Sequence, residues 1–290
     1  MSARRRSDRY WFRAKGRMHS SRHSSGSRVR PRPRPRDILR TLYIHSTLLL
    51  ALFFFMLFLG PVLLLAGLTV DRRRTLARRC VRAVFPRMIR HYCRLAGNPL
   101  ERRLGNVDFA ALGPCIIVAN HSSCMDVLLL MMLPLPAGTG RVWAKDWPFK
   151  VPLLGALMRL SGHLFVNDFN ILPDARDCLA DGSSLLVFPE SSRTRTGRVG
   201  RFREGAFLLA ARTGRPIVPV AIRGTFACMP PGQGWVFHPR LSIEVLGVLR
   251  GGANDPKAHA KLRRQAHALI ADALETPAQA ATPPPAHAAA

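Results

Sequence analysis

Apolar and polar positions divide the N-terminal part of the chain into two contrasting stretches. Residues 1–40 are rich in Arg, Ser and Pro and show no apolar periodicity, which predicts a disordered basic tail. Residues 41–70 are almost wholly apolar, because the 29 residues from Leu42 to Val70 contain no Asp, Glu, Lys or Arg. A helix of about 20 apolar residues spans a bilayer. The pattern therefore predicts a membrane segment over 41–70.

The form of this membrane segment is set by its flanks and by one interruption. Both flanks are strongly basic, so a single crossing in either direction conflicts with the preference of Lys and Arg for the cytoplasmic side. Gly60-Pro61 interrupts the apolar run, and proline breaks or kinks helices. We expect either one membrane helix or a helical hairpin, with halves Leu42–Leu59 and Pro61–Val70, that dips into the bilayer and returns to the same side.

The next stretch, residues 71–103, combines apolar residues at helical spacing with many arginines. Between Arg72 and Leu95 the apolar positions fall on one face of a helix and the arginines fill the others. This pattern predicts a basic amphipathic helix, kinked near Pro86, that lies on an anionic membrane surface. The alternative is an ordinary surface helix packed on the following domain, and both can hold.

From Asn106 onward, short apolar runs alternate with helical patterns. Together they predict one α/β domain over 104–275, with a mixed central sheet flanked by helices. The Ala/Pro-rich residues 276–290 are expected to be disordered. Strands are predicted near 115–119, 141–144, 163–166, 184–188, 217–222 and 241–247, and helices near 124–133, 151–160, 172–181, 203–213 and 257–275.

The charge distribution selects the partner of the basic stretches. The formal net charge is +27, of which residues 1–40 carry +12 and residues 71–103 carry +9. The excess thus brackets the apolar segment, which favours anionic lipid over nucleic acid as its partner. The six cysteines form no C-x-x-C pair, so the sequence indicates neither a zinc site nor a disulfide framework. We expect no metal, no cofactor and no nucleic acid.

The first candidate for chemistry follows the predicted strand 115–119. His121 lies in the turn after this strand, and Asp126 lies on the first turn of the next helix, for which Ser122 or Ser123 is a candidate cap. If the two side chains meet, the carboxylate fixes the imidazole tautomer and the free ring nitrogen takes a proton from a hydroxyl. A competing hypothesis makes Cys124 a nucleophile paired with His121.

A second polar loop follows the strand that ends at Phe188. Glu190, Ser191, Ser192 and Arg193 place a carboxylate, two hydroxyls and a cation at one strand end. Arginine and serine in such a loop can hold an anionic head group, and the alternative is a solvated basic loop. A further apolar run, 217–222, indicates a buried core strand.

These motifs, taken in order, resemble the glycerolipid acyltransferase family, typified by 1-acylglycerol-3-phosphate acyltransferase. The resemblance covers about residues 70–250. It is carried by Asn120-His121-x4-Asp126, Phe188-Pro189-Glu190-x-x-Arg193 and Val218-Pro219-Val220-Ala221-Ile222, with support from Lys145, Pro152-Leu153-Leu154-Gly155, Gly162-His163-Leu164-Phe165-Val166 and Phe202-Arg203-x-Gly205-Ala206.

The resemblance implies acyl transfer to a lysophospholipid at the cytoplasmic face of a bacterial inner membrane, most simply to 1-acylglycerol-3-phosphate. The co-substrate is acyl-CoA or acyl carrier protein, and no acyl-enzyme forms. His121 acts as the base and Asp126 orients it. Backbone N–H groups near the helix start after Ser123, or Lys145, are expected to hold the oxyanion. The implied substrate-binding residues are Glu190, Ser191, Ser192, Arg193, Lys145, Asn120 and Ser122.

Two departures from the family pattern bear on the acceptor. Asn167-Asp168 replace an arginine thought to hold the acceptor phosphate, and Ser191-Ser192 replace Gly-Thr. Either Arg159 or Arg195 takes over that role, or the acceptor is a lyso-lipid without a phosphate monoester, such as lyso-ornithine lipid. The alternative from another class is a membrane-tethered protein that binds anionic ligands without chemistry.

Overall fold

The computed structural model describes most of the chain from residue 33 onward. The described residues are 33–65, 70–95, 97, 100–136, 140–145, 147–151, 154–165, 171–230, 232, 234, 236–237, 239–252 and 255–276. The predicted disordered tails therefore lie mostly outside the described residues. Residues 35–40 of the predicted basic tail belong to a helix, which begins at Pro35.

The elements alternate along the chain as the sequence predicts. The helices are α1 (Pro35–Leu65), α2 (Val70–Leu95), α3 (Phe109–Leu112), α4 (Met125–Leu130), α5 (Trp147–Lys150), α6 (Leu154–Leu160), α7 (Ile171–Ala180), α8 (Gly205–Thr213), α9 (Thr225–Cys228) and α10 (Ala258–Glu275). The strands are β1 (Leu100–Arg103), β2 (Ile116–Ala119), β3 (Gly140–Ala144), β4 (Leu164–Phe165), β5 (Ser184–Val187), β6 (Ile217–Arg223) and β7 (Leu241–Val245).

The strands in the described part of the chain form one mixed sheet in the order β1-β7-β6-β2-β5-β3-β4. All neighbouring pairs are parallel except β6 and β7, which are antiparallel. This confirms the predicted α/β domain with a mixed sheet. The edge strand β1 lies inside the 71–103 stretch for which the sequence predicts a helix, because its Leu-Glu-Arg-Arg is too short and too charged to read as a strand.

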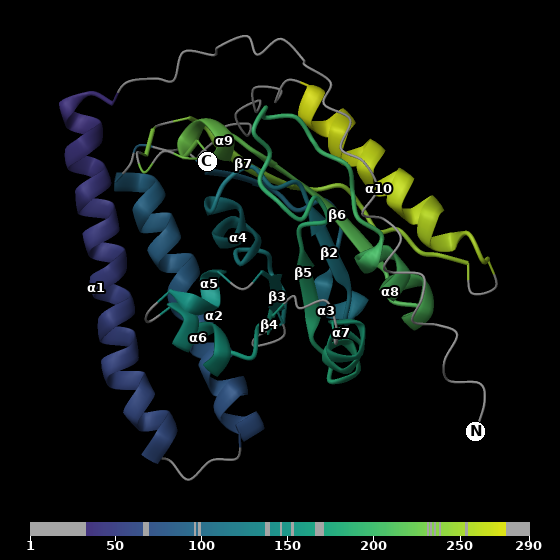
Figure 1. Ribbon diagram of the computed structural model, residues 1–290, viewed down its shortest axis with the longest axis horizontal. Helices are drawn as coiled ribbons and strands as arrows, with labels where there is room; N and C mark the ends of the chain where they lie inside the picture. The colour runs from purple at the N-terminus through teal and green to yellow at the C-terminus, as the bar shows by residue number, and fades with distance from the viewer. Residues whose placement is uncertain are drawn as a thin grey trace, which may run out of the picture. The chain divides into compact units, whose positions relative to one another are not determined.

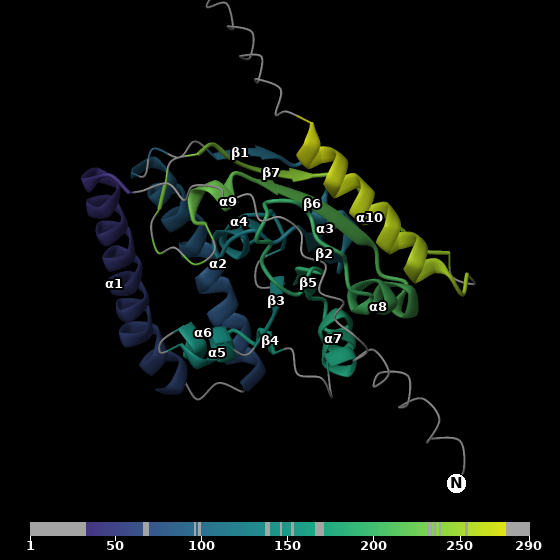
Figure 2. The ribbon, with the colours of Figure 1, turned by 45° about the horizontal axis from the view of Figure 1, so that its top comes forward.

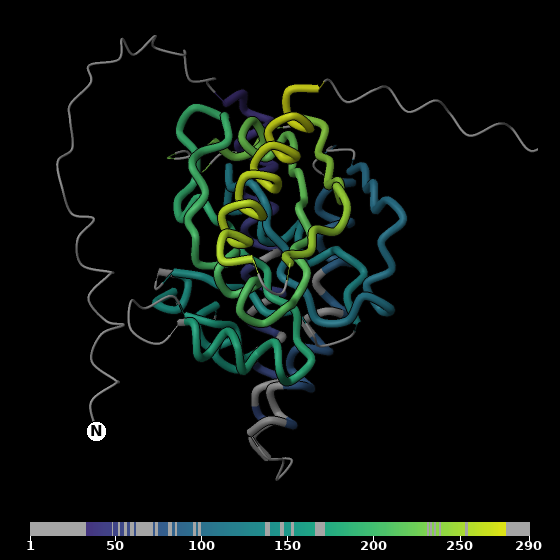
Figure 3. Tube along the Cα trace, turned by 90° about the vertical axis from the view of Figure 1, so that its right-hand side faces the viewer, coloured from purple at the N-terminus to yellow at the C-terminus, as the bar shows by residue number. Residues whose placement is uncertain are grey.

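Helices cover both faces of the sheet, and β2 shows why (Figure 2). Its residues are fully buried and alternate between the faces, as a strand requires. Ile117 and Ala119 pack in the core that includes α4 and the end of α2. Ile116 and Val118 pack in the second core, which α7, α8 and α10 close. Figure 3 shows α10 lying across this second face.

The N-terminal helices form an antiparallel pair beside the sheet (Figure 1). Of the two forms expected for this segment, the hairpin with halves Leu42–Leu59 and Pro61–Val70 is not found, because α1 continues through Pro61 to Leu65. A proline removes one hydrogen bond of the helix, and the flanking leucines propagate it beyond that point. Residues 66–69, between the two helices, lie outside the described residues. α2 likewise continues through Pro86.

The membrane helix expected over residues 41–70 is not found among the described residues. Among the residues that the structure describes, no helix combines the length and the apolarity that crossing a membrane requires.

Candidate active site

The two polar loops predicted from the sequence meet at the centre of the sheet. β2 lies between β5 and β6, parallel to both, with Val118 in register with Val187 and Pro219. The carboxyl ends of parallel strands lie at one edge, where α/β folds place their sites. His121 follows β2 and Glu190 follows β5, so strand order alone brings these two residues together.

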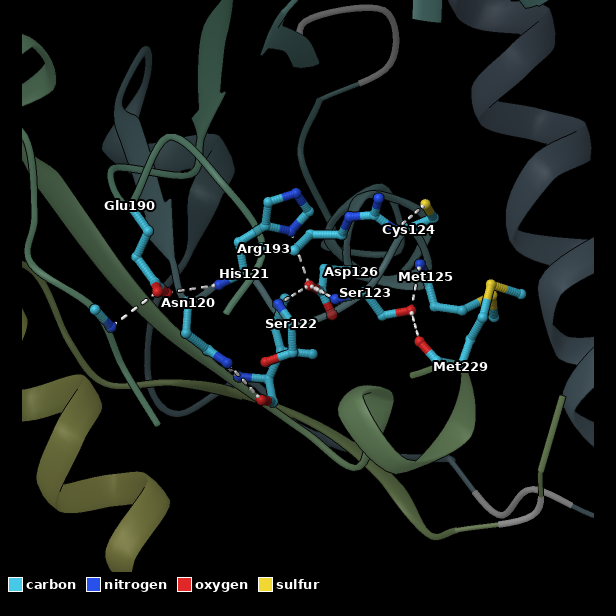
Figure 4. Close-up of polar contacts among 12 residues, drawn as sticks. Asn120, His121, Ser122, Ser123, Cys124, Met125, Asp126, Glu190, Arg193 and Met229 are labelled. Atoms are coloured by element: carbon cyan, nitrogen blue, oxygen red, sulfur yellow. Dashed lines mark hydrogen bonds and ion pairs between the residues drawn. The ribbon is translucent and has the colours of Figure 1, made fainter. Parts of the chain in front are cut away.

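One carboxylate oxygen of Asp126 accepts three hydrogen bonds. His121 Nδ1–H donates to Asp126 Oδ2 at 2.9 Å, and the backbone N–H groups of Ser122 and Ser123 donate to the same oxygen at 2.5 and 2.7 Å. The Asp126 side chain is fully buried, and the His121 side chain is 18% exposed. A carboxylate in this position holds Nδ1 protonated and leaves Nε2 as the acceptor. Figure 4 shows the arrangement.

The His121 ring is also held from its face. Phe188, the residue after β5, stacks on it with a centroid distance of 4.2 Å and an interplanar angle of 21°. No hydrogen bond within the described residues reaches Nε2, so this nitrogen remains available to a hydroxyl. The ring therefore has a fixed orientation, a fixed tautomer and a free basic atom, which are the properties of a general base.

Both oxygens of Glu190 bind backbone N–H groups. Oε1 accepts from His121 N–H at 2.8 Å, and Oε2 accepts from Gly200 N–H at 2.8 Å. Burial raises the pKa of Glu190 above its usual value, against the opposing effect of these hydrogen bonds. The sequence predicts that Glu190 binds the acceptor, and in the structure its carboxylate joins the backbone at His121 to the backbone at Gly200.

Comparisons with known proteins agree with this geometry. Residues 102–223 match the Acyltransferase family model, a range that contains both polar loops. A 1-acyl-sn-glycerol-3-phosphate acyltransferase of Chlamydomonas reinhardtii is 35% identical over 43% of this chain and 39% of its own length. One from Pseudomonas aeruginosa is 24% identical over 67% of this chain and 79% of its own length.

In sequence, the α/β domain is similar to 1-acyl-sn-glycerol-3-phosphate acyltransferases.

A solved structure shares the fold of this α/β domain. The crystal structure of the 1-acyl-sn-glycerophosphate acyltransferase PlsC from Thermotoga maritima superposes with a TM-score of 0.67. The two chains are 24% identical, and the match covers 83% of this chain and 95% of the other. The chain spans about two fifths of the length of several curated relatives that it matches, since the shared region is 39%, 42% and 37% of theirs.

Two of the predicted substrate-binding residues make hydrogen bonds within the fold, Asn120 through its side-chain amide and Ser122 through its backbone N–H. The Asn120 amide donates to Ile222 C=O at 2.9 Å and accepts from Ile222 N–H at 2.8 Å, so it joins β2 to the end of β6. The N–H of Ser122 is taken by Asp126. The Ser122 and Ser123 N–H groups are thus unavailable to an oxyanion. Cys124 precedes α4 and makes no capping hydrogen bond, whereas the predicted cap Ser123 accepts the N–H of Met125 through its Oγ at 3.4 Å.

The loop after Glu190 starts with a residue in a strained backbone conformation. Ser191 has φ of 61°, and it is the one non-glycine residue in the left-handed region among the residues described. The family pattern has glycine here, which adopts this conformation without steric cost. Ser192 and Arg193 are exposed. They and Ser191 therefore remain candidates for contact with an acceptor.

Cys124 contacts an arginine rather than the histidine. Arg193 Nη1–H donates to Cys124 Sγ at 3.2 Å. In Figure 4 the Arg193 side chain lies between the His121 ring and Cys124. This separation gives no support to a Cys–His nucleophile.

The remaining predicted residues lie around this centre. Lys145 is exposed directly after β3, a strand parallel to and paired with β5, so it stands at the same edge of the sheet. Arg159 lies on α6 and donates to Phe149 C=O at 2.7 Å. Asn167 and Asp168 lie outside the described residues. No cluster suited to a metal ion occurs in the described part of the domain.

Sequence reasoning missed Phe188 and Gly200. Phe188 was counted as part of a buried strand, although its place before Pro-Glu is part of the motif that carries the resemblance. Gly200 lies ten residues after Glu190 in a loop of many arginines, and no local pattern shows that its N–H returns to that carboxylate.

Proposed function

We propose that this chain transfers an acyl group from a thioester to the free hydroxyl of 1-acylglycerol-3-phosphate. The observation that carries the proposal is the His121–Asp126 pair at 2.9 Å, with Nε2 unoccupied. Nε2 takes the hydroxyl proton as the oxygen attacks the thioester carbon. When the tetrahedral intermediate collapses, the C–S bond breaks and the imidazolium returns the proton to the thiolate. No acyl-enzyme is needed, and no cofactor takes part.

Asp126 supports this reaction electrostatically. The base becomes cationic in the transition state, and a buried carboxylate in contact with Nδ1 stabilises that charge. The exposed Arg193 and the two serines before it are the groups proposed to bind the acceptor phosphate, since arginine matches phosphate with paired donors. Lys145 is proposed to assist at the oxyanion.

The proposal is tested by measuring transfer of labelled acyl groups to two acceptors. Wild type is compared with His121→Ala, using acyl-CoA and acyl carrier protein as donors, and lysophosphatidate and lyso-ornithine lipid as acceptors. We expect transfer to lysophosphatidate that falls about 10²–10⁴-fold in His121→Ala, as loss of a general base does. A matched control is His91→Ala, a histidine exposed on α2.

Each alternative has its own outcome in this assay. Transfer only to lyso-ornithine lipid would assign the enzyme to a head group without a phosphate monoester. Full activity in His121→Ala would show that His121 is not the general base. No transfer with either donor, together with binding of anionic lipid, would favour the non-enzymatic protein.

We propose further that the protein works on the cytoplasmic surface of the membrane. α1 exposes large apolar side chains along its length, including Leu39 at 69%, Leu49 at 60% and Phe58 at 66%. The exposed part of α2 beside it carries arginines such as Arg79 and Arg87. Apolar and cationic surface in one helix pair suits the interface of an anionic bilayer. Leu49→Glu with Phe58→Glu should reduce co-sedimentation with vesicles containing phosphatidylglycerol, and unchanged co-sedimentation would refute this location.

A further inference from the structure

The loop between β5 and α8 carries a dense set of exposed cations. We call residues Ser191–Arg203 the arginine loop. In the described structure none of its arginines has a carboxylate partner, and the first acid after it, Glu204, pairs with Arg263 of α10. Surface arginines without partners leave a strong positive field. The exposed arginines of the loop are Arg193, Arg195, Arg198, Arg201 and Arg203.

The backbone of the arginine loop is fixed at both ends and in the middle. Thr194 N–H donates to His121 C=O at 2.8 Å, and Arg203 N–H donates to Pro189 C=O at 2.8 Å. Gly200 is held on two sides, by Glu190 through its N–H and by His267 Nε2 of α10 on its carbonyl at 3.2 Å. A loop whose only task is to keep charge in water does not need such bonds. The arginines are therefore presented on a fixed frame that is bonded to the catalytic histidine.

The arginine loop lies on the opposite side of His121 from the helix pair α1–α2. In Figure 4, Glu190 lies on the α10 side of His121, and α2 lies beyond Met125 on the other side. The bond between Gly200 and His267 likewise places the middle of the arginine loop against α10. α1 packs against α2. The arginine loop therefore flanks the site on the α10 side, and the helix pair α1–α2 flanks it on the opposite side.

We propose that the arginine loop is the docking surface for an acidic carrier protein that presents the acyl thioester. This inference rests on the proposed function and names the donor. Small-molecule phosphates are usually bound in concave sites that bury most of the ligand. Beyond Arg193, which is proposed to bind the acceptor, the other loop arginines are instead exposed along the loop, which suits an acidic protein surface. Such complementarity speeds association and fixes orientation. The carrier docks from the α10 side, and its thioester reaches His121.

The test compares two donors that deliver the same acyl group. Arg198→Glu with Arg201→Glu reverses two charges in the loop at positions without a role in the proton transfer. With acyl carrier protein as donor, we expect KM to rise about tenfold or more at low salt, because repulsion replaces attraction at the rim of the interface. With acyl-CoA, KM and kcat should stay within about twofold, which also shows that the variant is folded. Arg212→Glu, an exposed arginine of α8 outside the loop, is the matched control.

The outcomes separate this inference from the proposed function. An unchanged KM for the carrier protein overturns it. An equal rise with both donors also overturns it, because the loop would then bind the acceptor or the CoA phosphates. Loss of vesicle binding with both KM values unchanged would assign the loop to lipid and overturn it too. In contrast, no transfer from either donor by the wild-type protein contradicts the proposed function itself.

Discussion

Replacing Glu190 by Gln tests whether this residue positions the base or binds the acceptor. Its two carboxylate oxygens accept N–H groups of His121 and Gly200, each at 2.8 Å. Glutamine has one oxygen, so its NH₂ group must face one of these two N–H donors. One of the two hydrogen bonds is lost. Either the backbone at Gly200 or the backbone at His121 must then move away from residue 190.

The expected loss of stability is modest because two effects oppose each other. A hydrogen bond to a charged group contributes about 1.5–3 kcal/mol. However, burial raises the pKa of Glu190, so the ionised carboxylate is disfavoured in the fold in spite of its two donors. A neutral amide avoids that cost, and we expect the unfolding free energy to fall by about 1–2 kcal/mol at neutral pH.

The sign of the pH dependence follows from the same shift. A carboxyl whose pKa is raised by folding contributes its full stability below its unfolded pKa near 4.5 and loses it as the pH rises through the folded value. Glutamine does not titrate. The gap in unfolding free energy between wild type and Glu190→Gln should therefore narrow as the pH rises above 4.5.

The assay is steady-state transfer from acyl-CoA to lysophosphatidate with both substrates varied. Displacing a catalytic group by about 1 Å can cost about 10²-fold, so we expect kcat to fall by about 10–100-fold with little change in KM for the acceptor. Glu204→Gln, a neighbouring glutamate exposed to solvent, is the control. An unchanged kcat with a raised acceptor KM would refute the positioning role and return Glu190 to the acceptor site.

Three further substitutions test other parts of the structure. Asp126→Asn should lower kcat about 10²–10⁴-fold with little change in KM, because the imidazolium loses its counter-charge; unaltered kcat would contradict the pair. Ser191→Gly should raise the unfolding free energy by about 0.5–1 kcal/mol, measured by urea denaturation, because φ of 61° costs serine more than glycine; a loss of stability would exclude strain there. Burial and the cations Arg78 and Arg141 lower the pKa of His163 to about 4. Stability should therefore fall by up to about 3 kcal/mol as the pH drops from 6.5 towards 4, and His163→Gln should flatten this dependence, unless the wild-type curve is itself flat.

The sequence alone determined the alternation of helices and strands in the domain and the contact between His121 and Asp126. Buried strands were predicted because β2 and β6 are continuous apolar runs between polar turns, and burial on both faces requires such runs. The His121-x4-Asp126 spacing predicted a contact across a strand–helix turn, since the turn is local and both residues lie within it. Local patterns are enough for features that form within a few residues.

The tertiary structure decided everything that depends on distant partners. The edge strand β1 forms because β7 offers it a parallel neighbour, more than 130 residues away in the sequence. Only the fold shows that the Asn120 amide binds the backbone of Ile222 and that Glu190 binds the N–H of Gly200, because residue type does not reveal which donor a carboxylate or amide will meet. α1 continues through Gly60-Pro61 because one missing hydrogen bond does not end a helix whose neighbours favour it. The sequence thus determined which groups are present and which local turns they form, and only the fold decided which of them are occupied by the backbone and which are left free for a substrate.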